Sequence, residues 1–399
     1  MVDVDAGSFL VIVTLAAVAA VLAGTVQPHL AIPVVVIEIL GGILVGPDLL
    51  ELATPDEFIE FFSNLGLGML FFFAGYEIDF ERIRGAPLRL AIIGWGISLV
   101  LAYSIGGILA AAGVVLSLLY TGSAMATTAI GTLIPILSDA GELRTRFGTK
   151  LLAAGAMGEF GPILLITLVF STRGTISNIV ILLAFVAIAV ATAVVAMSEV
   201  RRGWELFERT LESSGQLGIR VAVVLIFALV ALASELGLDP LLGGFVAGVI
   251  TRIALKDREV GVFESKLTAV GYGFFIPFFF ITSGLKFDLD AVTSTPLEVP
   301  MFLALFLVVR GVPALLLYRR EMDLRDRYAL ALFSATQLPL VVAITTIAVE
   351  QDHMRSSTAA SLVGAAILST MLFPLAALKL REGRAGLEPS GEPGFGTVP

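Results

Sequence analysis

The chain has 399 residues, of which 57% are hydrophobic and 15% charged, and it contains no cysteine. This composition, with a mean hydropathy of +0.97, excludes a soluble globular domain, a disulfide framework and thiolate chemistry. The net charge of −9 argues against nucleic acid as a partner, and with only His29 and His353 as histidines we expect no metal centre built on imidazole and no cofactor.

Apolar windows of about 20 residues, the length that crosses a bilayer, follow one another along the chain. They predict an all-α polytopic membrane protein with about thirteen transmembrane helices. The predicted ranges are 7–25, 30–46, 61–76, 88–112, 115–138, 148–171, 177–198, 217–236, 239–252, 268–285, 299–318, 326–349 and 357–378. The first follows the acidic start MVDVD without a basic region, so we expect a retained helix and not a cleaved signal.

Along the predicted series of membrane helices, loops rich in lysine and arginine alternate with loops that contain few of them. If the N-terminus lies outside the cell, nearly all of the 25 lysines and arginines fall in cytoplasmic loops. The outer loops hold only Arg173, Lys286 and Arg355. We therefore expect a multi-pass protein of the plasma (inner) membrane, with its N-terminus outside and its C-terminus in the cytoplasm.

Two stretches of the first half recur in the second half. EILGGILVGPD at 38–48 resembles PLLGGFVAGVI at 240–250, and FFFAGYEIDF at 71–80 resembles FITSGLKFDL at 280–289. Each match is seven spans apart, so the second copy enters the bilayer from the opposite side. This arrangement predicts two inverted six-helix repeats, which is the usual architecture of secondary transporters.

The repeats divide the chain into four parts. The first repeat covers 1–171 and the second covers 217–378. Between them, the linker 172–216 ends in the charged RRGWELFERTLESSGQ, which we expect to form an interfacial helix. The tail 379–399 is rich in glycine and proline, so we expect a disordered cytoplasmic segment.

The fifth and twelfth spans, which the repeat pairs with each other, both carry a polar cluster followed by a proline. The sequences are GSAMATTAIGTLIPIL and FSATQLPLVVAITT. The polar residues are Ser123, Thr127 and Thr128 in the first and Ser334, Thr336 and Gln337 in the second. Because a proline removes a backbone donor and interrupts a helix, we expect a pair of discontinuous helices, broken by Pro135 and Pro339, at the middle of the membrane.

Two charged side chains lie in the middle of otherwise apolar spans. Glu159 interrupts AAGAMGEFGPILLITLVF, and Arg310 interrupts MFLALFLVVRGVPALLLYRR. A charge at the centre of a membrane helix costs about 2.5–3.5 kcal/mol even on insertion scales, so such residues mark ion paths or substrate sites. Four other charged residues are assigned to helix packing, the interface or snorkelling at span ends: Glu38, Glu235, Lys150 and Lys286.

These motifs together resemble the monovalent cation/proton antiporter superfamily, in its branch of bacterial sodium/proton antiporters and potassium-efflux proteins. The resemblance rests on GGILVGP (41–47), FFFAGYEID (71–79), FFIPFFFITSGLKFD (274–288), the polar fifth span and an acid on the sixth. It implies a homodimer with a mobile core that contains the two crossing helices. It also implies that Glu159 binds the proton or the monovalent cation and that Arg310 faces it.

The chain departs from this family beside the acid. The family usually has an aspartate preceded by Asn, Asp or Gln, whereas this chain has Gly158 and Glu159. With one core carboxylate, we expect an electroneutral exchange of one proton for one cation. Thr127 and Thr128 are expected to supply further oxygen ligands for the cation.

The sequence leaves other functions open, although none of them is an enzyme. Arg310 could form a static ion pair with Glu159, or it could bind the substrate of an anion or organic-acid carrier with a related inverted fold. A membrane sensor that transports nothing is a further alternative. Sodium and potassium are not distinguished as the exchanged cation.

Overall fold

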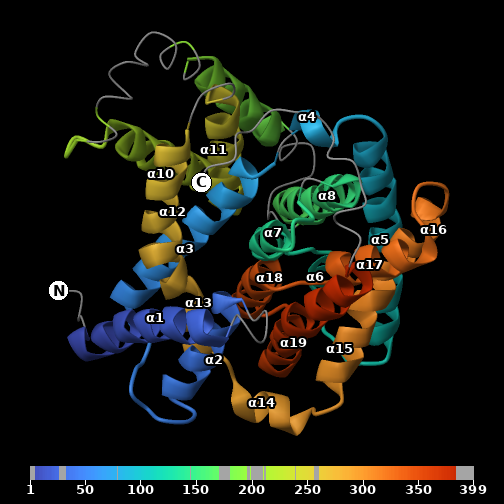
Figure 1. The fold of residues 1–399 in the computed structure, drawn as a ribbon. Helices are drawn as coiled ribbons and strands as arrows, with labels where there is room; N and C mark the ends of the chain where they lie inside the picture. Colours follow the sequence, from blue (N-terminus) through green and yellow to red (C-terminus); the bar gives the residue numbers. More distant parts are fainter. Residues whose placement is uncertain are drawn as a thin grey trace. The chain divides into compact units, whose positions relative to one another are not determined.

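The computed structural model describes residues 5–26, 33–78, 80–143, 145–169, 180–195, 198, 210, 213–238, 240–255 and 260–382. Every regular element in these ranges is a helix (Figure 1). Helix occupies part of each of the thirteen predicted ranges. Eight helices in the described part of the chain are long and apolar enough to cross a membrane, which fits the predicted all-α membrane class. The number of crossings stays a prediction.

Some predictions concern residues beyond these ranges. His29, residues 201–209, 211 and 212 of the expected interfacial helix, and tail residues 383–399 lie outside the described residues. The chain divides into two compact units, of which the first comprises 1–28, 34–79 and 163–287 and the second comprises 29–33, 80–162 and 288–399.

The first unit contains the glycine-rich helices of both repeated stretches. Its helices are α1 (Ala6–Val26), α2 (Val34–Val45), α3 (Glu57–Tyr76), a helix at Val180–Val195, α10 (Leu217–Leu236), α11 (Pro240–Ala254), α12 (Gly261–Val270), the π-helix η1 (Gly271–Phe275) and α13 (Ile276–Leu285). The start of α3 is fixed by Asp56, whose Oδ1 accepts a hydrogen bond of 2.7 Å from the Ile59 amide.

In this unit, α2 packs on α13 with almost no space between the two backbones. A Cβ atom on Gly42 of α2 would collide with the carbonyl oxygen of Ile281, and one on Gly284 of α13 would collide with that of Ile39. Glycine is therefore required at both positions for the close approach.

The same kind of contact joins α3 to α11, which are the repeat counterparts of α13 and α2. A Cβ on Gly75 would collide with the Phe245 carbonyl, and one on Gly248 would collide with the Phe72 carbonyl. By the repeat alignment, Gly75 corresponds to Gly284, but its contact lies one helical turn beyond the counterpart of Ile39. The two stretches that the sequence predicts to be copies thus use corresponding pairs of helices in a slightly different register.

The second unit contains the two discontinuous helices and the helices around them. They are α4 (Phe80–Ile83), α5 (Ala86–Ala111), α6 (Leu118–Met125), α7 (Ile130–Asp139), most of α8 (Arg146–Val169), α14 (Leu289–Ser294), α15 (Glu298–Phe306), the π-helix η2 (Leu307–Gly311), α16 (Val312–Leu317), η3 (Tyr318–Arg320), α17 (Leu324–Ser334), α18 (Pro339–Glu350) and α19 (Ser356–Arg381).

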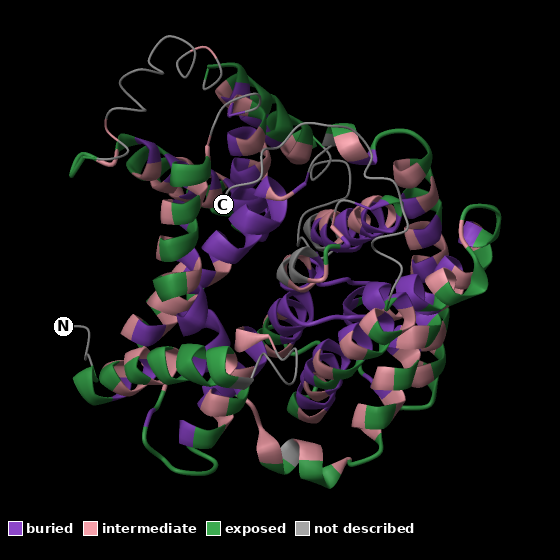
Figure 2. Cartoon of the chain, in the orientation of Figure 1, coloured by how far each residue is buried: buried purple, intermediate pink, exposed green. Residues whose placement is uncertain are grey.

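Burial differs sharply between the helices of this unit (Figure 2). The apolar window in α17 and α18 is 78% buried, whereas that of α5 is 22% buried. Val100 and Ile108 of α5 are among its exposed apolar residues. In a membrane protein such an exposed apolar surface suits contact with lipid. The discontinuous helix α17–α18, which is mostly buried, belongs instead to the core of this unit.

Both predicted breaks exist, but only one of them lies at its proline. The fifth span is interrupted at 126–129 and the twelfth at 335–338. Pro339 opens α18 as its first residue, where its missing amide costs nothing. Pro135, in contrast, lies inside α7, so the prediction that it breaks the fifth span is wrong. There the interruption is stabilised by hydrogen bonds from the broken backbone to neighbouring segments, as described next.

Candidate functional site

The two breaks are joined directly to each other and to α8. The Thr128 amide donates a hydrogen bond of 3.1 Å to the Gly158 carbonyl, and the Ala129 amide donates one of 2.9 Å to the Thr336 carbonyl. Backbone groups that leave a helix inside a membrane need such partners, because no water is available in hydrocarbon. The crossing of the two helices therefore supplies the hydrogen bonds that each break requires.

Gln337 connects the breaks through its side chain. Its Nε2 donates to the Met125 carbonyl at 2.9 Å, and its Oε1 accepts from the Thr127 hydroxyl at 3.1 Å. Its backbone is held by α19, because Ser369 Oγ lies 3.0 Å from its amide and Thr370 Oγ1 lies 3.2 Å from its carbonyl. Gln337 is thus a fixed bridge between the two discontinuous helices.

Glu159 lies on α8 and is buried, with 5% of its surface exposed. Its Oε1 accepts one long hydrogen bond of 3.4 Å from the amide of Gly131, the second residue of α7. Its Oε2 has no partner among the described residues. The carboxylate therefore sits at the positive end of the α7 dipole with one oxygen available to another ligand.

Arg310 is equally buried, on the π-helix η2. Its Nε donates to Thr128 Oγ1 at 2.9 Å, its Nη1 to Ser98 Oγ at 3.2 Å and its Nη2 to the Ala154 carbonyl at 3.1 Å. A longer contact of 3.4 Å joins Nε to the Ser334 carbonyl. All these acceptors are neutral.

The resemblance implies that Arg310 faces Glu159. Among the ion pairs of the described part of the chain, none joins these two side chains within 4.0 Å. The static ion pair left open by the sequence is therefore absent from this conformation.

Gly158 explains how α8 accommodates the guanidinium group. A Cβ atom at this position would lie 2.6 Å from Thr128 Cβ, 2.7 Å from Arg310 Nη2 and 2.7 Å from Thr128 Oγ1. These distances are about 1 Å shorter than normal contacts between non-bonded carbon atoms. Any side chain beside Glu159 would have to displace Thr128 and Arg310.

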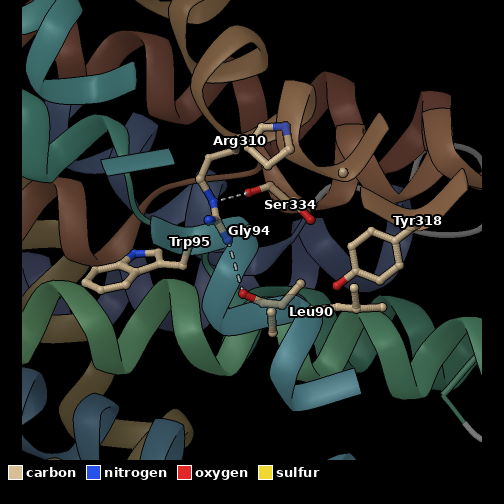
Figure 3. A pocket seen from close by; sticks show the side chains of 10 residues that line it. Leu90, Gly94, Trp95, Arg310, Tyr318 and Ser334 are labelled. Carbon is tan, nitrogen blue, oxygen red and sulfur yellow. Dashed lines mark hydrogen bonds between the residues drawn. The ribbon is translucent and has the colours of Figure 1, made fainter. Parts of the chain in front are cut away.

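A small cavity of about 20 Å³ adjoins Arg310 (Figure 3). It is lined by residues of α5, α8, the segment around η2 and α16, and α17, and two of its polar atoms, Ser334 Oγ and Tyr318 Oη, have no partner among the described residues. A cavity of roughly 10–15 Å³ suffices for one water molecule when polar groups line it. The cavity can therefore hydrate Arg310 on the side that its four protein acceptors leave open.

The structure brings together some of the predicted site residues and separates others. Thr128, Arg310 and Ser334 form one hydrogen-bonded group, and Thr127 pairs with Gln337. Ser123 instead bonds to Tyr103 at 3.1 Å, and Thr336 bonds back to the Leu332 carbonyl at 3.2 Å.

The sequence did not single out several groups that complete the site. Ser98 accepts from Arg310, Gly131 donates to Glu159, and Trp95 Nε1 donates to the Ala126 carbonyl at 3.2 Å within the first break. For Ser98 and Trp95 a signal exists, because they are polar side chains in the apolar stretch GWGISLV. The role of Gly131 rests on its backbone amide and leaves no signal in the side-chain pattern.

Comparison with known proteins gives a consistent result. The sequence model of the family described as "Sodium/hydrogen exchanger, transmembrane" matches residues 13–378. The chain is 31% identical over 303 residues to Na(+)/H(+) antiporter NhaS5 of Synechocystis, covering 72% of this chain and 42% of that protein. It is 25% identical over 283 residues to Na(+)/H(+)-K(+) antiporter GerN of Bacillus cereus, covering 68% and 70%.

Another relative and a solved structure extend this similarity over most of the chain. YjbQ of Bacillus subtilis is 27% identical over 373 residues, and the match spans 88% of this chain but only 59% of the length of YjbQ. The structure of the sodium proton antiporter MjNhaP1 from Methanocaldococcus jannaschii at pH 8 superposes with a TM-score of 0.62. That match covers 96% of this chain and 99% of the other at 16% identity, which establishes a common fold.

Proposed function

Because this chain belongs to the transmembrane sodium/hydrogen exchanger family, we propose that it exchanges a monovalent cation, Na⁺ or K⁺, for protons across the membrane. Glu159 is the shared site of this exchange. A proton or a cation neutralises its carboxylate, and the neutral carrier crosses between its two orientations more easily than the empty, charged one. Antiport follows from this competition and needs no second acidic site.

The observation that carries the proposal is the coordination of Glu159. A buried carboxylate normally has its oxygens satisfied, yet among the residues that the structure describes Oε2 has no partner and Oε1 accepts one long hydrogen bond. Such a group suits a ligand that comes and goes. Thr127 is a further candidate ligand, because its hydroxyl donates to the Gln337 side chain and keeps oxygen lone pairs for a cation.

The stoichiometry in this proposal is one proton for one cation. Gly158 stands where a second acidic or amide side chain would lie in many family members, and its surroundings are filled by Thr128 and Arg310. One carboxylate exchanges one proton for one monovalent cation without net movement of charge.

The proposed architecture is a pair of inverted repeats, in a homodimer of the plasma membrane with its C-terminus in the cytoplasm. The reciprocal packing of α2 on α13 and of α11 on α3 supports the repeat, since an inverted copy reproduces the same helix pair. Names of relatives include both sodium and potassium, so both cations belong in the first assay.

The test is proton flux in proteoliposomes, measured with an internal pH dye after addition of Na⁺ or K⁺. Glu159→Gln should abolish the cation-driven signal while the protein still folds, because the substitution removes the titratable group and relieves its burial cost. Glu38→Gln is the matched control, since Glu38 is also a buried acid on an apolar helix. Exchange at the wild-type rate in Glu159→Gln would refute the assignment.

The same vesicles test whether the protein is an anion carrier and not a cation/proton exchanger. Its supporting observation is the buried charge of Arg310, whose described partners are all neutral. An anion carrier would move protons when the external anion is changed at constant Na⁺ and K⁺. A cation/proton exchanger would respond to the cation alone.

A further inference from the structure

Far along α7 and α8 from Glu159, a second buried charge cluster holds the loop that joins these two helices. Arg381 Nε donates a hydrogen bond of 2.8 Å to Glu142 Oε1, and Arg381 Nη2 donates one of 2.8 Å to Glu142 Oε2. The Arg381 Nη1 atom lies 2.9 Å from Asp326 Oδ1, and its guanidinium carbon lies 4.4 Å from the centre of the Phe147 ring. Arg381 and Glu142 are each only 2% exposed.

The position of Glu142 gives this pair its significance. It lies between the end of α7 and the start of α8, so its pair with Arg381 holds the loop of the hairpin that these two helices form. At the opposite end, the first residues of α7 face the Glu159 carboxylate and the Thr128 amide binds the Gly158 carbonyl. A displacement of the loop would therefore change how α7 meets α8 at Glu159.

Arg381 is also the last residue of α19, and α19 holds the second discontinuous helix. Ser369 and Thr370 of α19 bind the backbone of Gln337 within the break of that helix. Asp326, in the first turn of α17, is bound by Arg381 itself. One helix thus contacts the start and the break of α17–α18 as well as the hairpin that carries Glu159.

We propose that Arg381 is a positioning residue for the exchange site: its bidentate pair with Glu142 sets the α7–α8 hairpin in register with α19 and hence with the second discontinuous helix. The inference rests on the proposed function. It assigns a role in ion binding to a group that touches neither ion.

The Arg381–Glu142 pair contributes more to geometry than to stability. Replacing a buried ion pair by apolar residues of similar volume is often neutral or stabilising, whereas removing one partner alone is strongly destabilising. An arginine bound through two parallel hydrogen bonds is, however, fixed in direction as well as distance. The pair therefore supplies a defined register that apolar packing of the same volume does not.

Two variants separate position from stability. Arg381→Met removes the charge and leaves the Glu142 carboxylate buried without its partner, so the melting temperature of the purified protein should fall. In the double variant Arg381→Met with Glu142→Met, neither charge of the buried pair remains. Only Asp326, whose side chain is 13% exposed, keeps a charge that Arg381 had bound, so the melting temperature should largely recover. Lys286→Met, which breaks the half-exposed pair with Glu60 in the first unit, is the control.

The deciding measurement is the half-maximal cation concentration of proton flux in proteoliposomes, normalised to folded protein. Substitutions at residues that contact neither ligand can change the coupling between sites by about 2–30-fold. We expect an increase of about tenfold in both the single and the double variant, and no change in Lys286→Met.

The outcomes are distinct. A double variant that regains the wild-type half-maximal concentration together with its stability would overturn the positioning role and leave Arg381 as a structural residue. So would a single variant that loses stability but keeps the wild-type value. A wild-type protein without cation-driven proton flux would instead overturn the proposed function, and this inference with it.

Discussion

Replacing Gly158 with alanine would place one methyl group in the space that Thr128 and the Arg310 guanidinium now occupy. The added Cβ would lie 2.6 Å from Thr128 Cβ and 2.7 Å from Arg310 Nη2. Because carbon atoms pack at about 3.5–4.0 Å, these neighbours must move by about 1 Å. Neither neighbour is free to do so, since Thr128 is bonded through its amide and its hydroxyl and Arg310 through three of its nitrogens.

The cost can be assembled from the contacts that such a movement disrupts. Overpacking a tight core costs about 1–3 kcal/mol. Losing the charged hydrogen bond from Arg310 Nε to Thr128 Oγ1 adds about 1.5–3 kcal/mol, and losing the Thr128 hydroxyl bond to the Ser334 carbonyl adds about 0.5–1.5 kcal/mol. The free energy of unfolding should therefore fall by about 3–7.5 kcal/mol, which is large for one methyl group.

The assay is thermal unfolding of the purified protein in detergent together with proton flux in proteoliposomes. Gly107→Ala in α5 is the matched control, because a Cβ there meets nothing within 4 Å. That variant should be as stable as the wild type or more stable by up to about 1 kcal/mol, since alanine favours helix. Equal melting temperatures and exchange rates for Gly158→Ala and Gly107→Ala would refute the packing argument.

Three further predictions concern the same site. Arg310→Lys should lower the maximal exchange rate by about tenfold, because an ammonium group cannot reach the separate acceptors that the planar guanidinium binds; a wild-type rate would contradict this. Thr127→Ala should raise the half-maximal cation concentration more than it changes the maximal rate, which a cation titration measures; an unchanged value would leave Thr127 with a structural role. The initial rate should be the same at zero potential and at a potassium-diffusion potential of about 100 mV, whereas net movement of one charge would be biased by about 2.3 kcal/mol.

The helices and the existence of two interrupted spans could be predicted because their signals are local. Span length and charge alternation identify membrane helices, and polar clusters in apolar surroundings identify places where backbone is exposed inside the protein. At Pro339 the proline signal predicts the structure correctly. Pro339 is the first residue of α18, and the first position of a helix needs no backbone amide.

At Pro135 the same signal fails, because this proline lies inside α7. Its sequence context resembles that of Pro339, but the fifth span is interrupted several residues earlier, around Thr127 and Thr128. The reason is tertiary, since the amides of Thr128 and Ala129 bind carbonyls of α8 and of the second break. Such bonds depend on how distant segments cross, which the composition of the span does not encode.

The partners of Arg310 were likewise beyond sequence reasoning. A buried acid and a buried base invite the assumption of a pair, yet Arg310 binds a hydroxyl on α5, a carbonyl on α8 and a hydroxyl in the first break. Its place on a π-helix turn also left no sequence signal. In contrast, Gly158 was visible as a departure from the family pattern, and only the structure supplies its cause.

The separation of Arg310 from Glu159 bears directly on how a single carboxylate can exchange ions. A guanidinium bound to Glu159 through two hydrogen bonds would be a permanent competitor for the oxygens that the proton and the cation need. Here the donors of Arg310 are taken by Thr128, Ser98 and Ala154 instead. These hydrogen bonds thus prevent the arginine from becoming the ligand that an exchanged ion would have to displace.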